Sequence, residues 1–289
     1  VLPEKDETEQ CDIATLKNVR LSHPNSPLIG FLNVNSLRNK ITDLRVVMET
    51  FLPDILAISE TKLDNSFPVA QFEVGGYFLP IRKDRNQYGG GIIVFARKGT
   101  IYKRKPELEP LKFCECLSIE ITIKNKSWII MSIYRPPTNA RTEEFFEELS
   151  KFVNQAIDKY DNIIVMGDIN IDTKSIGQDA TKLRDFCDIF CLTNLITQNT
   201  CITSRSISSI DVILTNRPKS FQKSCAASVG LSDYHKLIVT SIKSHLHRQE
   251  SLKIKCRSFR CFNADSYVSD VSNIKVEHKI VNANEFHDQ

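Results

Sequence analysis

The stretch that decides the fold is IIVMGDIN, residues 163–170. Its first four residues form a short apolar run, which is typical of a strand buried in a sheet. Gly167-Asp168-Ile169-Asn170 follows at once, so this strand would deliver the Asp168 carboxylate and the Asn170 amide to the edge of the sheet. Such groups, held on a rigid sheet, suit the binding of Mg²⁺ and a phosphate group.

Four more polar clusters stand next to apolar runs. They are Leu32-Asn33-Val34-Asn35, Ser59-Glu60-Thr61, Ser209-Ile210-Asp211 and Leu231-Ser232-Asp233-Tyr234-His235. Each cluster by itself fits an ordinary turn or a solvated strand end. Their repetition favours a common cleft in which several strand ends present polar groups to one ligand.

The rest of the chain alternates between helix and strand patterns. Helices are predicted at 37–51, 142–160 and 181–192. Strands are predicted at 28–34, 55–59, 92–96, 117–123, 127–134, 163–166, 210–214 and 237–242. This mixture indicates an α/β protein with mixed sheets. We expect one domain over residues 28–245, a polar N-terminal segment at 1–27, and a trailing segment or linker at 246–289.

Composition narrows the class of protein. The 38 Lys and Arg residues nearly balance 35 Asp and Glu, so the net charge of +3 does not by itself indicate a nucleic-acid partner. None of the nine cysteines forms a CxxC pair, which argues against a zinc site and for reduced thiols. No leader and no run of 18 apolar residues occur, so we expect no membrane partner and an intracellular protein, nuclear or cytoplasmic.

Positive charge gathers over residues 82–105. A DNA backbone would be attracted to such a stretch, whereas the alternative is a solvated face of strands and loops. The sequence leaves both interpretations open. The basic residues are Arg82, Lys83, Arg85, Arg97, Lys98, Lys103, Arg104 and Lys105.

The polar clusters occur in the order and approximate spacing of the motifs of a known family. These motifs are Asn33-Val34-Asn35-Ser36-Leu37, Ser59-Glu60-Thr61-Lys62, Ile133-Tyr134-Arg135-Pro136-Pro137, Gly167-Asp168-Ile169-Asn170, the segment 209–216, and Ser232-Asp233-Tyr234-His235-Lys236. With them the chain resembles the endonuclease/exonuclease/phosphatase superfamily, and within it the apurinic-like endonuclease domain of non-LTR retrotransposons, across residues 28–243. The resemblance implies a four-layer α/β/β/α sandwich with two facing mixed β-sheets.

The resemblance also implies a metal site and a general base. Glu60, with Asn35 and Asp233, would hold Mg²⁺, with Mn²⁺ as a substitute, and the ion would neutralise charge on the phosphate and the leaving oxygen. Asp168 would orient or deprotonate the attacking water.

The remaining implied roles concern the phosphate. Asn33 and Asn170 would hydrogen-bond the phosphate or the nucleophile, and Tyr134 would donate to a phosphate oxygen. His235, oriented by Asp211, would face the phosphate as a cation. Arg135 would touch a flanking phosphate.

Two positions depart from the family pattern. Repair-type members place an acid where Asn35 stands, and a neutral amide is a poorer Mg²⁺ ligand. In the last motif His usually follows Asp directly, whereas Tyr234 intervenes here. Either a bulge restores the position of His235 or catalysis is impaired.

The resemblance implies an Mg²⁺-dependent endonuclease that nicks DNA and leaves a 3′ hydroxyl. One rival is a phosphatase or phosphodiesterase of the same superfamily, and fold alone does not exclude it. The other rival is a degenerate copy that binds nucleic acid without cutting it. No aspartate-rich polymerase motif follows the predicted domain, so we expect an isolated domain of retrotransposon origin.

Overall fold

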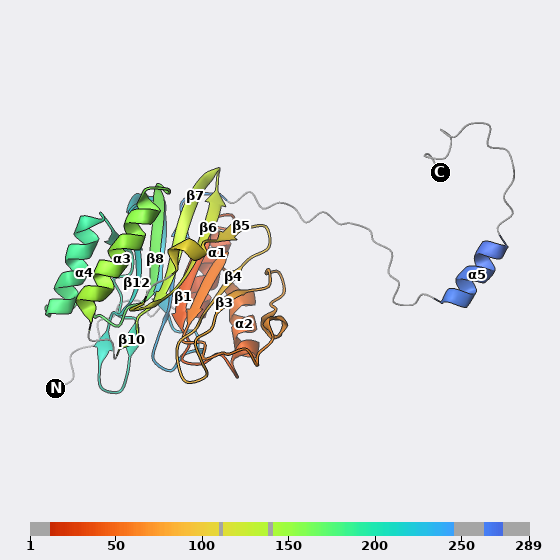
Figure 1. The fold of residues 1–289 in the computed structure, drawn as a ribbon, viewed down its shortest axis with the longest axis horizontal. Helices are drawn as coiled ribbons and strands as arrows, with labels where there is room; N and C mark the ends of the chain where they lie inside the picture. The colour runs from red at the N-terminus through yellow and green to blue at the C-terminus, as the bar shows by residue number, and fades with distance from the viewer. Residues whose placement is uncertain (1–11, 110–111, 138–140, 246–262, 274–289) are drawn as a thin grey trace. The chain divides into compact units, whose positions relative to one another are not determined.

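The computed structural model describes residues 12–109, 112–137, 141–245 and 263–273 (Figure 1). The chain divides into two units, residues 1–249 and 250–289. The second unit contains one described helix, α5 (Ala264–Ser272), whose residues are all exposed. Most of the expected trailing segment lies outside the described residues. The first unit holds every predicted motif.

Two six-stranded sheets form the centre of the first unit. The first has the order β13 (Phe221–Ala227), β14 (Leu237–Ile242), β1 (Leu28–Asn33), β2 (Ile55–Ser59), β4 (Ile92–Ala96), β3 (Ile81–Lys83). The second has the order β5 (Ile101–Arg104), β6 (Glu115–Ile123), β7 (Lys126–Tyr134), β8 (Asn162–Asp168), β12 (Asp211–Thr215), β9 (Thr193–Asn194). One neighbouring pair in each sheet is parallel, β1 with β2 and β7 with β8, so both sheets are mixed.

The two sheets face each other across one apolar core. Ile29 and Phe31 of the first sheet and Ile119 and Ile130 of the second are fully buried in it. Because adjacent residues of a strand point to opposite faces, each sheet also has an outer apolar face that helices must cover.

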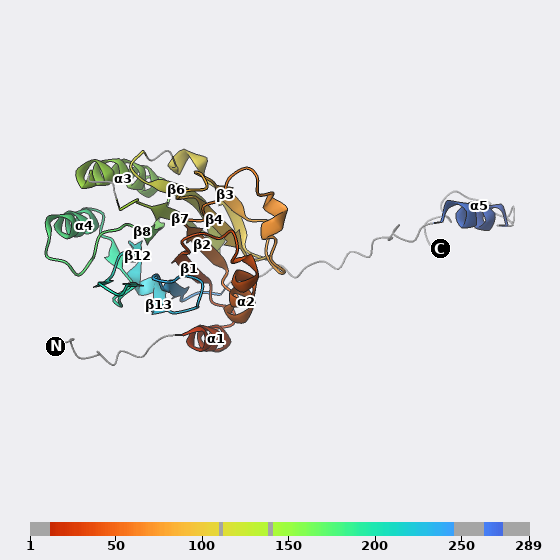
Figure 2. The same ribbon diagram turned by 90° about the horizontal axis from the view of Figure 1, so that it is seen from below.

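Helices cover both outer faces (Figure 2). The helices α1 (Ile13–Ser22) and α2 (Ile41–Phe51) share a core with the first sheet, and α3 (Thr142–Ile157) and α4 (Gln178–Ile189) share one with the second. The resulting α/β/β/α sandwich confirms the predicted fold. The short elements are the 3₁₀ helices η1 (Val69–Phe72), η2 (Pro106–Leu108) and η3 (Pro218–Ser220), and the hairpin β10 (Cys201–Ile202) with β11 (Ile207–Ser208).

Helix α1 lies in the segment that the sequence analysis placed outside the fold. Its residues Leu16 and Val19 are buried in the core of the first sheet. Its Arg20 is 6% exposed and donates to the carbonyl oxygens of Leu52 (2.7 Å) and Ser26 (3.0 Å). The folded unit therefore begins before residue 28.

We expect Arg20→Ala to destabilise the fold strongly. Arg20 Nη2 lies 2.6 Å from Asp54 Oδ2, and Asp54 is 1% exposed. Removing the guanidinium leaves that carboxylate buried without its ion pair, at a cost of about 3–5 kcal/mol in the free energy of unfolding. Urea denaturation measures the loss. Lys17→Ala, an exposed change on the same helix, should alter stability by less than about 0.5 kcal/mol.

Candidate active site

One row of side chains crosses the second sheet where its strands meet the predicted cleft. Tyr134, the last residue of β7, pairs with Asp168, the last residue of β8, and Asp168 pairs with Asp211, the first residue of β12. Directly paired residues on neighbouring strands point to the same face of a sheet. Tyr134, Asp168 and Asp211 thus form one polar edge, which the separate motifs build together.

Asn33 at the end of β1 joins the first sheet to this row. Its Nδ2 donates to Glu60 Oε1 (2.9 Å) and to Asp168 Oδ2 (2.8 Å), and its Oδ1 accepts from the backbone N–H of Asn35 (3.1 Å). Asn33 is 1% exposed, so its amide holds two carboxylates in place. Its contacts make it a positioning residue for Glu60 and Asp168.

The turn that carries Glu60 depends on two glycines. Gly90 and Gly91 have φ of +68° and +87°, and a Cβ on Gly91 would collide with Thr61 Oγ1. The carbonyl of Gly90 accepts from the N–H of Lys62 (2.9 Å), and that of Gly91 accepts from the N–H of Thr61 (3.3 Å). A side chain at position 91 would therefore push the Glu60 turn away.

His235 completes the row despite the inserted Tyr234. Its Nδ1 lies 3.1 Å from Asp211 Oδ2, and its Nε2 lies 4.0 Å from Asp168 Oδ2. The loop absorbs the extra residue: Tyr234 is 48% exposed, and Ser232 Oγ accepts from the backbone N–H of His235 (3.2 Å). Of the two alternatives, the structure favours the one in which the imidazole reaches its carboxylate partner.

The charges in this row shift each other's pKa. Burial opposes a charge on His235, but the hydrogen bonds to Asp211 and Cys201 and the charges of Asp211 and Asp168 together outweigh burial and raise the pKa of His235 to about 11. Burial, followed by repulsion from Asp211, raises the pKa of the Asp168 carboxyl to about 7. Burial and the nearby Glu60 carboxylate raise the pKa of Tyr134. Near neutral pH these shifts favour a cationic His235, a neutral Tyr134 and an Asp168 carboxyl that is partly protonated.

Asn170 and Arg135 support the row from behind. The backbone N–H of Asn170 donates to Asp168 Oδ1 (3.0 Å), and its Nδ2 donates to the carbonyl of Arg135 (2.7 Å). Arg135 is only 3% exposed, donates from Nη2 to Thr142 Oγ1 (2.9 Å), and lies over the Phe145 ring. The sequence analysis expected the Arg135 guanidinium to touch a flanking phosphate. In the structure its guanidinium is not placed to do so. It fixes the end of β7 instead.

Two of the three predicted metal ligands face the same lysine. Glu60 and Asn35 lie together, and the ammonium of Lys62 lies 2.5 Å from Asn35 Oδ1 and 3.9 Å from Glu60 Oε2. A carboxylate oxygen and an amide oxygen are hard donors of the kind that Mg²⁺ takes, so Glu60 and Asn35 would hold such an ion with Lys62 displaced. Asp233 is exposed and, with Tyr234, lines a hollow of about 210 Å³.

A second metal arrangement is present in the row itself. Asp168, Asp211 and His235 each offer a ligand atom, and these atoms lie within 4.8 Å of one another. Asp211 and His235 are already bonded to each other, whereas Glu60 Oε2 faces the ammonium of Lys62. The hard oxygens of Glu60 and Asn35 match Mg²⁺ better than a set that includes imidazole.

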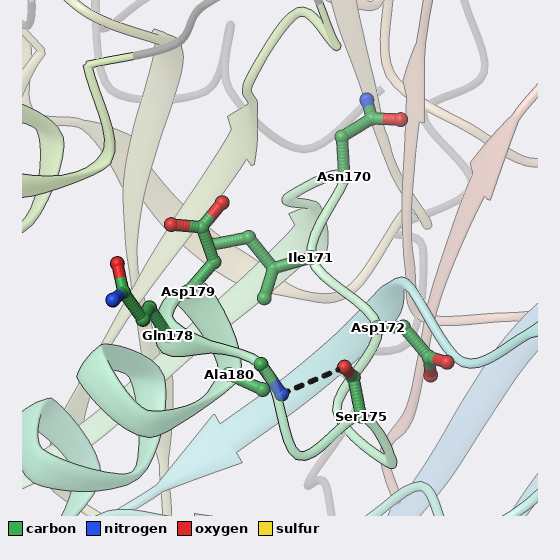
Figure 3. A pocket seen from close by; sticks show the side chains of 8 residues that line it. Asn170, Ile171, Asp172, Ser175, Gln178, Asp179 and Ala180 are labelled. Carbon is green, nitrogen blue, oxygen red and sulfur yellow. Dashed lines mark hydrogen bonds between the residues drawn. The ribbon is translucent and has the colours of Figure 1, made fainter.

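A larger hollow, of about 470 Å³, opens beside Asn170 (Figure 3). Asn170 lies at one end of the group drawn, and Gln178 and Asp179, on the first turn of α4, lie at the other. Asp172 ties this loop to the start of β12, because its Oδ1 accepts from the N–H of Ser209 (3.0 Å). With two carboxylates in its lining, this hollow is less suited to a phosphate than the row.

Several residues of the site were not predicted from the sequence. Lys62 was quoted only as part of a motif, and Cys201, whose Sγ lies 4.0 Å from His235 Nε2, carried no signal. Glu115 pairs with Tyr134 and so stands at the head of the row. In a regular hairpin, residues equally far from the turn at Lys124-Asn125 pair with each other. The predicted hairpin therefore already implied that Glu115 lies opposite Tyr134.

Comparison with known proteins identifies the family. The model of the Endonuclease/Exonuclease/phosphatase family matches residues 30–233. The chain belongs to this family. Its members include nucleases and phosphatases, so the chain belongs to a family of hydrolytic enzymes.

Individual relatives of this family member are distant. Exodeoxyribonuclease III of Haemophilus influenzae is 23% identical over 148 residues, which are 48% of this chain and 55% of that protein, so the match spans about half of the relative's length. The endonuclease domain of TRAS1, a telomere-specific non-LTR retrotransposon, has a TM-score of 0.61 and 14% identity over 76% of this chain and 99% of that one. A variant of the 3′ phosphatase NExo from Neisseria, bound to a product DNA hairpin, has a TM-score of 0.60 and 17% identity over 75% and 99%.

The raised pKa of Asp168 predicts the acid side of the pH profile of this family member. If Asp168 is the general base that the family resemblance implies, it acts only when deprotonated, so kcat/KM should rise about tenfold per pH unit on the acid side and level off near pH 7. Asp211 and His235 face Asp168 across the row, and Asn33 faces it from β1. The cationic form of His235 is lost only near pH 11. Initial rates from about pH 5 to about pH 9 check this, and a flat profile would contradict it.

Proposed function

We propose that this chain is a divalent-metal-dependent endonuclease that nicks DNA by hydrolysing a phosphodiester bond and leaves a 3′ hydroxyl. The observation that carries this proposal is the series of contacts from Asp211 through His235, Asp168 and Asn33 to Glu60, which runs across both sheets. It combines a cation, a base and an oxygen ligand within one edge of the sandwich. Metal-assisted hydrolysis of a phosphodiester can use all three groups.

Each residue of the site has its own role in the proposed hydrolysis. Asp168 takes the proton of the attacking water, since it is buried and its pKa lies near neutrality. His235 donates to a phosphate oxygen as a cation, and Asp211 keeps it charged. The Tyr134 hydroxyl donates to the same phosphate. A divalent ion held by Glu60 and Asn35 supplies charge neutralisation at the phosphate and leaving oxygen when bound.

DNA is the substrate that the relatives favour. The names of the three similar proteins refer to a deoxyribonuclease, an endonuclease and a phosphatase bound to a DNA hairpin. The TRAS1 domain in addition supports an origin in a non-LTR retrotransposon. No helix within the described ranges is both long and apolar enough to cross a membrane.

The basic stretch at 82–105 supports this substrate less than its sequence suggests. Four of its eight cations lie close to acids of the same unit. The close pairs are Arg82 with Asp84 (2.6 Å), Lys105 with Glu120 (2.7 Å), Arg85 with Glu115 (2.8 Å) and Arg104 with Glu109 (2.8 Å). Much of this stretch is therefore a network of surface ion pairs.

The test is a nicking assay run beside a phosphatase assay. Supercoiled plasmid is incubated with the protein in Mg²⁺, with EDTA as control, and phosphate release from a 3′-phosphorylated DNA end is measured in parallel. The proposal expects nicking that EDTA stops. The NExo similarity gives the second candidate, a DNA 3′ phosphatase. Phosphate release without nicking would favour that candidate.

A further inference from the structure

Arg85 is held at the rim of the active site by the glycine loop. Its Nε donates to the carbonyl of Gly89 (2.9 Å), and its Nη1 lies 2.8 Å from Glu115 Oε1. A Cβ on Gly90 would lie 2.6 Å from the central carbon of the guanidinium, so the group packs flat against the glycine backbone. Among the described residues these contacts leave Nη2 without a hydrogen-bond acceptor, and the side chain is 39% exposed.

This guanidinium adjoins the catalytic row. Glu115, its ion-pair partner, is the direct neighbour of Tyr134 across β6 and β7. The Arg85 charge opposes the rise in the pKa of Tyr134. The Glu60 charge contributes to the raised pKa of Glu115. The charges of Arg85, Glu60, Glu115 and Tyr134 therefore act on one another. The same glycine loop binds the turn after Glu60.

The other nearby arginines are committed elsewhere. Arg135 is 3% exposed. Arg82 pairs with Asp84 through both Nε (3.1 Å) and Nη2 (2.6 Å), and its Nη1 donates to the carbonyl of Phe67 (2.7 Å). Arg38 donates to the carbonyl of Lys62 and lies over the Phe67 ring. Arg85 combines exposure with a free donor edge beside Tyr134.

We propose that Arg85 binds a DNA phosphate adjacent to the scissile one and so sets the register of the strand in the site. This inference rests on the proposed function, because it names a contact with the same substrate. Glu115 fixes the guanidinium in advance, so that little side-chain freedom is lost on binding. A guanidinium presents planar paired donors that match a phosphate. Arg85 thus takes the role that the sequence analysis gave to Arg135.

The experiment measures binding to a labelled DNA duplex by fluorescence anisotropy, with Ca²⁺ in place of Mg²⁺, between about 50 and 200 mM salt. Each protein–phosphate contact contributes about 0.9 to the slope of log Kobs against log salt, so Arg85→Ala should reduce the slope by about 0.9. Arg85→Gln removes the charge but keeps amide donors, and should give the same loss. The matched control is Arg217→Ala, an exposed arginine just beyond the far end of β12.

The outcomes separate this inference from the proposed function. A slope that is unchanged in Arg85→Gln would overturn the inference, even if nicking fell, because it would mean that Arg85 only supports the glycine loop. Wild-type protein that nicks DNA with an Arg85-independent slope keeps the endonuclease proposal alone. Wild-type protein that binds with an Arg85-dependent slope but never cuts keeps the Arg85 contact alone. A wild-type protein that binds no DNA overturns the Arg85 contact.

Discussion

Asp168→Asn should lower the nicking rate by roughly 10³-fold or more, because it removes the only buried carboxylate of the described site that faces both His235 and Asn33. The amide keeps the shape of the side chain but takes no proton from water. Rates of plasmid nicking at saturating Mg²⁺ measure the effect. The acid limb of the pH profile should disappear with it.

The control for this change is Asp188→Asn, which alters an exposed carboxylate on α4. It should nick plasmid at the wild-type rate. A thermal melt that is unchanged in Asp168→Asn would separate lost chemistry from lost folding. Full activity in Asp168→Asn would exclude this residue as the base and would favour Glu60 in that role.

Asp211→Asn should lower kcat by roughly 10²–10⁴-fold. The Asp211 carboxylate accepts from His235 Nδ1 and makes the largest contribution, with Cys201 and Asp168, to the rise in the imidazole pKa to about 11 against the effect of burial. With a neutral amide the pKa of His235 falls, so the cation is lost at lower pH. The alkaline limb of the pH profile should therefore move toward neutrality, a shift that a merely structural defect would not produce.

A double variant tests whether the pair acts as one unit. If Asp211 works through His235, then Asp211→Asn combined with His235→Ala should be no slower than His235→Ala alone. Losses that multiply would instead indicate separate roles. An Asp211→Asn enzyme with unchanged rate and profile would sink the proposed pairing.

The sequence predicted the sandwich because its signals are local. The run at 163–166 is apolar throughout, and strand β8 is buried along its whole length. The helix α3 has Phe145, Leu149 and Val153 on one face, and all three are buried. Strand-end clusters also sufficed to bring Asn33, Asp168 and Asp211 together, since these motifs lie where strands of the two facing sheets meet one edge of the sandwich.

What the sequence could not supply depends on contacts between distant segments. Arg20 lies on a polar segment. It stabilises the fold through the carbonyls of Phe51 and Leu52 and the carboxylate of Asp54, which lie 31, 32 and 34 residues further along the chain. Arg135 directly follows Tyr134 within its motif, yet its guanidinium contacts a buried threonine and a phenylalanine ring. Likewise, the charges at 82–105 were visible, but the acids that pair with them were not assignable before the strands were placed.

The position of His235 shows where a motif match stops being informative. Inserting Tyr234 would displace a side chain by one step if the loop were a regular strand. The loop instead turns Tyr234 outward, and the backbone is held there by Ser232 and by the N–H of Ile202, which donates to the Tyr234 carbonyl (2.9 Å). The spacing of the motif alone could not show whether the loop would turn Tyr234 outward and keep His235 in place.

The most direct test of the endonuclease proposal is the nature of the ends made from supercoiled plasmid in Mg²⁺ by wild-type protein and by Glu60→Gln. The expected product is open-circular DNA whose nicks a DNA polymerase extends without further treatment, as a 3′ hydroxyl allows, with little product from Glu60→Gln or in EDTA. Plasmid that is bound but stays supercoiled in Mg²⁺ and in Mn²⁺, with equal binding by Glu60→Gln, would contradict it and indicate a nucleic-acid-binding domain that no longer cuts.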